Sequence, residues 1–150
     1  MRLLLPMFAV LFAGCAPAPA PVTKAAVDPV TEDWYGPVTA QLAAMDREAE
    51  GLIRAGKSDQ AAAVITKGQA LANRLLTAPR PTLAAMEAAS DLDQLYAGML
   101  LGNKNYGWAR LAFQKNVSRW KHWRPQTADT ARRLKLAQDG LAECDKRMGQ

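Results

Sequence analysis

The chain has 150 residues, a formal net charge of +5 and a hydrophobic fraction of 49%. This length is enough for one domain with a real core, and the abundance of alanine and leucine, with few aromatic residues, favours helices throughout. Two cysteines and one histidine are too few for a disulfide framework or for a metal site built on two histidines.

Residues 3–12 form a short apolar segment that is followed by Ala13, Gly14 and Cys15. The segment has about half the length that a membrane-spanning helix requires, and its layout is typical of a secretory signal. The cysteine directly after two small residues resembles the lipobox of bacterial lipoproteins. This resemblance implies that the signal peptide, residues 1–14, is removed and that Cys15 carries fatty acyl chains such as palmitate, which anchor the chain in a membrane. An ordinary signal peptide with an incidental cysteine is the alternative interpretation.

Residues 15–33 are predicted to be a tether between the lipidated cysteine and the domain. Alanine and proline alternate from Ala16 to Pro21, and each proline favours an extended backbone at its own position and at the preceding residue. Such a segment is a semi-rigid spacer of about 20 Å. Ala16 stands where an aspartate often retains lipoproteins in the inner membrane, so the resemblance to Gram-negative lipoproteins implies the outer membrane, facing the periplasm.

Residues 34–150 have helical periodicity, and none of their segments is typical of a strand. The predicted breaks between helices lie at Gly56, at 77–81, near Gly102 and at Pro125. The predicted N-caps are Ser58, Thr82 and Thr127. Because short connections make neighbouring helices antiparallel, the sequence predicts an all-α domain of about five antiparallel helices.

The segment from Gly56 to Ala61 resembles the turn inside a tetratricopeptide repeat, where a glycine ends the first helix and a small residue five positions later lets the second helix pack closely. A similar pattern, from Gly102 to Gly107, begins 46 residues later. The resemblance implies two stacked α-hairpins followed by a C-terminal capping helix, with a surface that binds other proteins.

The predicted fourth helix, residues 105–124, is the most unusual element. The segment 101–126 contains six Lys and Arg residues and no acidic residue, so it is expected to attract anionic partners. One arc of the helix is apolar and is predicted to face the core, and Trp108 lies outside the centre of that arc. The candidate binding residues on the side of Trp108 are Trp108 itself, Lys104, Lys115, Arg119 and His122. The alternative interpretation is a core helix whose solvent side is basic.

No combination of residues is typical of catalysis, of a metal site or of a cofactor site. Asp91 and Asp93 point in different directions on a helix. Asp46 and Glu50 share one helix face, and we expect both to be solvated surface charges. Cys144 is predicted to be buried as a small hydrophobic residue, with pairing between molecules as the alternative.

These patterns predict a membrane-anchored helical lipoprotein, and not an enzyme, that acts as a protein-binding adaptor or assembly factor in the bacterial cell envelope. Its partners would be the membrane, through the lipid anchor, and an envelope protein. The alternative is that the basic aromatic helix binds an anionic envelope polymer or lipid headgroup. Nucleic acid is not expected as a partner because an exported chain does not meet it.

Overall fold

The structure, a computed structural model, describes residues 27–149, so the predicted signal peptide, Cys15 and most of the predicted tether lie outside the described residues. The elements are η1 (Pro29–Thr31), α1 (Tyr35–Arg54), α2 (Ser58–Leu75), α3 (Leu83–Gly102), α4 (Tyr106–His122) and α5 (Ala128–Met148). The predicted all-α fold with five helices is confirmed, and the described residues contain no strand.

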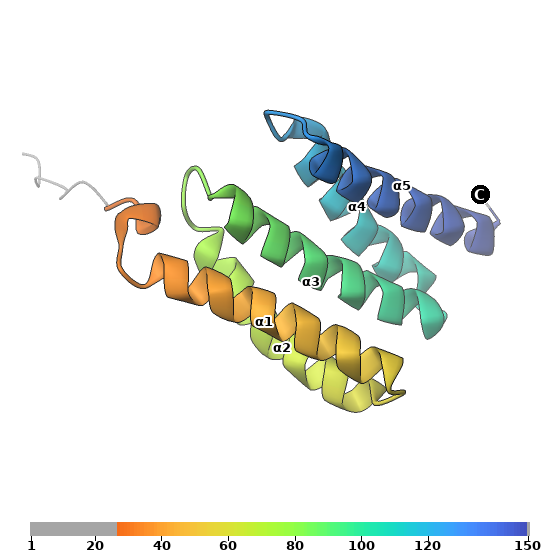
Figure 1. Cartoon of the computed structure of the whole chain (residues 1–150). Helices are drawn as coiled ribbons and strands as arrows, with labels where there is room; N and C mark the ends of the chain where they lie inside the picture. The colour runs from red at the N-terminus through yellow and green to blue at the C-terminus, as the bar shows by residue number, and fades with distance from the viewer. Residues whose placement is uncertain (1–26, 150) are drawn as a thin grey trace, which may run out of the picture.

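The helices form two layers (Figure 1). Helices α1 and α2 form one hairpin, α3 and α4 form a second, and α5 packs mainly against α4. Helix α3 is central because it contacts all four of the other α-helices. Helices α1, α3 and α5 lie side by side in one layer, and α2 and α4 form the other. This arrangement confirms the two α-hairpins and the C-terminal helix that follows them.

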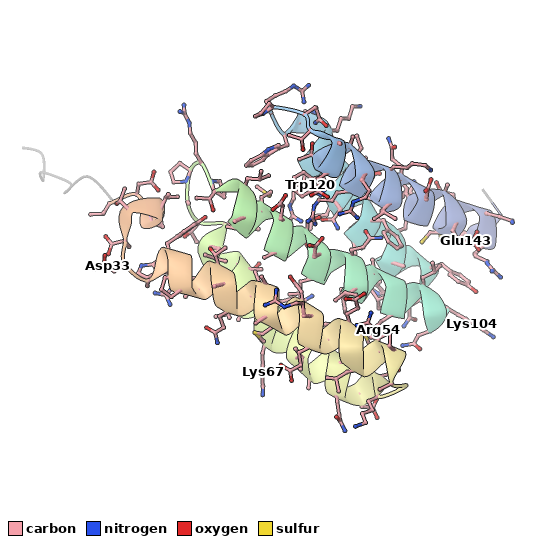
Figure 2. All side chains as sticks on the ribbon, in the orientation of Figure 1. Asp33, Arg54, Lys67, Lys104, Trp120 and Glu143 are labelled. Atoms are coloured by element: carbon pink, nitrogen blue, oxygen red, sulfur yellow. The ribbon has the colours of Figure 1, made fainter. Side chains whose placement is uncertain are left out.

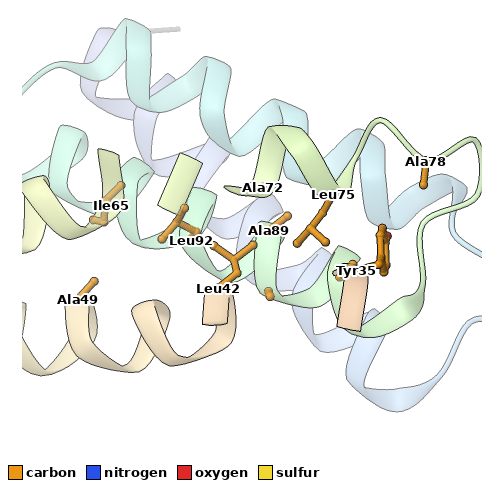
Figure 3. Packing of buried hydrophobic residues seen from close by; sticks show 11 residues of the cluster. Tyr35, Leu42, Ala49, Ile65, Ala72, Leu75, Ala78, Ala89 and Leu92 are labelled. Atoms are coloured by element: carbon orange, nitrogen blue, oxygen red, sulfur yellow. The ribbon is translucent and has the colours of Figure 1, made fainter. Parts of the chain in front are cut away.

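The core consists of two clusters along this stack. The first joins α1, α2 and α3 through Leu42, Ile65 and Leu92, with many alanines between them (Figure 3). The second joins α3, α4 and α5 and contains Phe113 and Cys144. Cys144 is fully buried with a free thiol, as the sequence predicted, and burial raises the pKa of this thiol.

Two of the three predicted N-caps are confirmed. The Thr82 hydroxyl accepts a hydrogen bond from the backbone N–H of Ala85, at 3.2 Å. Thr127 and Thr130 form a reciprocal capping box at the start of α5. The prediction for Ser58 is wrong, because Ser58 is already the first helical residue of α2 and Lys57 occupies the cap position without a side-chain hydrogen bond.

The turns of the two hairpins have the same backbone structure. Gly56 and Lys104 adopt the left-handed conformation, with φ of 71° and 63°. The residue after each donates its N–H to a carbonyl five positions earlier, Lys57 to Leu52 and Asn105 to Leu100, both at 2.9 Å. These are the bonds of a Schellman motif, which ends a helix by satisfying its last carbonyl groups.

The internal similarity is therefore present, but its spacing differs from the sequence prediction. Gly56 corresponds to Lys104, which is 48 residues later, and the small residue that follows is Ala109. Ala61 and Ala109 are both fully buried. The predicted pair Gly102 and Gly107 does not form the turn, since these residues lie inside α3 and α4.

Glycine at position 104 is expected to stabilise the domain. A lysine in the left-handed conformation costs about 1 kcal/mol relative to glycine, and Lys104 lies at the turn between α3 and α4 (Figure 2). The Lys104→Gly variant should therefore gain about 1 kcal/mol in the free energy of unfolding, measured by urea denaturation. Gly56→Ala at the equivalent position should lose a similar amount, and a loss at both positions would contradict the assignment of the two turns.

Candidate functional site

A groove of about 940 Å³ crosses the layer formed by α1, α3 and α5. The residues that line the groove come from α1, from α3 with Thr82 before it, and from the beginning of α5. Small side chains leave the space open: the groove is lined by Gly36, Ala40, Ala43, Ala84 and Ala88. The alanine-rich composition that favours helices therefore also creates a concavity between them.

Charged side chains of both signs line the groove. The carboxylates belong to Asp46, Glu50, Glu87 and Asp91, and the guanidinium groups belong to Arg47, Arg132 and Arg133. They come from three different helices, so the fold collects charges that are far apart in the sequence. The groove has one carboxyl group more than it has guanidinium groups.

Arg133 is the centre of an ion-pair cluster at one end of the groove. Its side chain is mostly buried, pairs with Asp91, and lies 2.9 Å from an oxygen of Asp129 and 3.9 Å from one of Glu87. Arg132 also pairs with Asp129, at 2.6 Å. The hydrogen bonds from both arginines lower the pKa of Asp129 to about 2. The positive charges contributed by α5 are therefore already neutralised within the protein.

Asp46 differs from the other charged groups of the groove. It is only 8% exposed, and its Oδ1 atom is buried without a hydrogen-bond partner. Burial raises the pKa of Asp46 to about 8, and the negative charge of Asp91 adds to this effect, whereas Arg133 and Arg47 oppose it. An unpaired buried carboxyl group in a cleft is a typical feature of a functional site.

The prediction that Asp46 is a solvated surface charge is wrong. Helix α3 packs beside α1 and removes Asp46 from water. The helical spacing indicates this burial, because Asp46 lies four residues after Leu42 and three before Ala49. Both of these residues are fully buried. Glu50, one turn later, does lie at the surface and pairs with Arg54 at 3.5 Å.

Trp108, the main candidate on α4, is on the surface and is 69% exposed. Leu111, one turn later, is also exposed, so the outer side of α4 has two large apolar side chains. Lys104 precedes this helix in the left-handed turn position, and His122 ends the helix with its Nδ1 atom 2.8 Å from the carbonyl oxygen of Ser118. These four residues lie outside the groove.

Arg119 and Lys115, the other two candidates, meet at Asp93 of α3. The Arg119 side chain is only 7% exposed and both of its terminal nitrogens lie 3.1 Å from one oxygen of Asp93. It also donates a 2.6 Å hydrogen bond to Asn116. Lys115 approaches the same Asp93 oxygen at 2.9 Å from a side chain that is 53% exposed. Contrary to expectation, Arg119 does not present its charge to solvent, and it holds α4 against α3.

Comparisons with known proteins give no match, whether with protein families, with curated proteins or with solved structures. Among residues 27–149, no helix combines the length and the apolar character that crossing a membrane requires. In the same part of the chain, no three acidic, histidine or cysteine side chains are grouped so that they could hold a metal ion.

Proposed function

We propose that this chain is a lipid-anchored adaptor of the bacterial cell envelope and that its groove holds a segment of a partner protein. The groove itself is the observation that carries the proposal. Its volume of about 940 Å³ suits several side chains of a bound segment, and stacked α-hairpins commonly use such concave surfaces to bind proteins.

Binding is favoured over catalysis by the state of the polar groups in the groove. The two hydroxyl groups that line it are engaged with the backbone: Thr39 donates to the carbonyl of Tyr35 at 2.9 Å, and Thr82 caps α3. Neither is paired with a base that would activate it as a nucleophile. Arg133 and Asp91 neutralise one another. The groove therefore provides shape and charge for recognition.

The proposed lipid anchor rests on the lipobox resemblance at Cys15 and on the alternating alanine and proline residues that follow it. A tether of this kind limits the domain to a thin layer beside the membrane. Such confinement raises the effective concentration of the domain toward partners in the same membrane. The outer membrane, facing the periplasm, is the proposed location.

Photo-cross-linking from the groove tests this function. A photoreactive residue at position 84, in the groove, is expected to cross-link a defined segment of one envelope protein, whereas the same residue at position 63, on α2, should not. The purified partner should then bind Ala84→Trp at least tenfold more weakly than Ala63→Trp. Equal affinities would contradict binding in the groove.

The Cys15→Ser variant tests the lipid anchor separately. This variant is expected to give a lower cross-linking yield from position 84 in intact envelopes, because it cannot be acylated at position 15.

The second candidate function is binding of an anionic polymer or lipid headgroup by α4. The exposed pair of Trp108 and Leu111 favours it, because an aromatic side chain beside lysines suits a membrane surface. The engagement of Arg119 and Lys115 with Asp93 weakens it. A photoreactive residue at position 108 separates the two candidate functions. Labelling of lipid or polymer in place of protein would favour binding of an anionic ligand by α4.

A further inference from the structure

We infer, on the basis of the proposed function, that the partner segment places a lysine or arginine side chain in the groove and that this cation pairs with Asp46. The first reason is the state of the carboxyl group. Asp46 is more than nine-tenths buried, lines the groove, and has an Oδ1 atom with no hydrogen-bond partner. A buried acceptor without a partner is unfavourable, and a donor supplied by a ligand would remove that cost.

The charges of the groove also favour a cation. When Asp46 is protonated, the three remaining carboxylates balance the three guanidinium groups that line the groove. When Asp46 is ionised, the groove has one uncompensated negative charge. One bound ammonium or guanidinium group would neutralise it, and the low dielectric of the site strengthens such a pair.

The arginines of the protein do not already play this role. Arg133 is engaged by Asp91, Asp129 and Glu87, and Arg132 is held by Asp129. An anionic ligand would have to displace these internal carboxylates to pair with Arg132 or Arg133, whereas a cationic ligand finds the Oδ1 atom of Asp46 without a partner. At Asp46 the site therefore favours a positively charged side chain.

Binding of this cation is linked to the release of a proton. The charged groups around Asp46 are Arg47 and Glu50 on α1, Glu87, Asp91 and Asp93 on α3, and Arg132 and Arg133 on α5. Burial and these charges leave Asp46 mostly protonated at neutral pH, since its pKa is about 8. A bound cation lowers that pKa, so a proton leaves as the ligand binds. The affinity should therefore increase about tenfold for each unit by which the pH rises toward 8, and it should level off above pH 8.

Two matched peptides test the inference on the full-length chain in an uncharged detergent. The probes are acetyl-Ala-Arg-Ala-amide and the same peptide with citrulline, which has nearly the shape of arginine but no charge. The native chain is expected to bind the arginine peptide at least tenfold more tightly, as measured by NMR titration of amide signals in the groove. Asp46→Asn should bind both peptides equally.

Glu48→Gln is the control, because it removes the same charge from an exposed carboxylate of α1 that does not line the groove. This variant should keep the preference of the native chain for arginine. Calorimetry at pH 7 in buffers of different ionisation enthalpy should show nearly one proton released per arginine peptide by the native chain, and none by Asp46→Asn. Equal binding of the two peptides, no binding of either, or an unchanged preference in Asp46→Asn would overturn the inference.

Failure of this inference and failure of the proposed function have different signatures. A cross-link from position 84 to a partner segment without a basic residue would leave the groove as a protein-binding site and would refute the role of Asp46. The absence of any cross-link from the groove, together with tight binding of the arginine peptide, would refute the adaptor function and leave a site for a small cationic ligand.

Discussion

Replacing Arg119 with alanine is expected to lower the free energy of unfolding by about 3 kcal/mol. The guanidinium group is almost completely buried and holds Asp93 with two of its nitrogens. Its removal leaves a carboxylate that is itself only slightly exposed, and Lys115 alone then compensates this charge. The hydrogen bond to Asn116 is lost in the same variant. Urea denaturation followed by circular dichroism measures the effect.

Lys115→Ala is the matched control, because Lys115 contacts the same oxygen of Asp93 from an exposed position. Exposed ion pairs contribute about 1 kcal/mol or less, so this variant should remain close to the native chain in stability. Equal effects of the two substitutions would show that Arg119 is not the structural link between α3 and α4. A selective loss in Arg119→Ala would remove this residue from any surface that binds anions.

The fold was predictable where local chemistry decides it. Thr82 and Thr127 cap their helices through hydrogen bonds to residues only three positions away, and the apolar periodicity of each helix indicates its buried side. The left-handed residue at Lys104 was not predictable in this way, because glycine is the usual residue at such a position and Gly102 stands nearby. Helix α3 ends at Gly102, so the left-handed position of the turn falls two residues later, on Lys104.

The candidate site was less predictable, because it depends on contacts between distant segments. Arg119 and Asp93 are 26 residues apart, and Arg133 and Asp91 are 42 residues apart. Nothing local in the sequence pairs them. The burial of Asp46 depends on the packing of α3 against α1, and its position between Leu42 and Ala49 was the signal available beforehand. Trp108 was placed correctly outside the centre of the core-facing arc, because that position depends only on helical spacing.

Replacing Asp46 with asparagine is expected to stabilise the protein at neutral pH. The pKa of Asp46 is raised from 3.8 to about 8 in the folded chain, so between these values the folded state holds a proton that the unfolded state releases. The free energy of unfolding of the native chain therefore falls as the pH rises through this range. Asparagine cannot ionise and avoids the loss, which amounts to as much as about 4 kcal/mol at pH 7.

The stability difference between Asp46→Asn and the native chain, measured by urea denaturation from about pH 4 to about pH 10, isolates this group because the contributions of the other carboxyl groups cancel. We expect the difference to be small near pH 4, to grow with pH and to level off above pH 8. A flat difference would mean that Asp46 has a partner in solution. A growing difference would show that the chain keeps a carboxyl group that weakens its fold at neutral pH, and such a cost is typical of positions that serve binding.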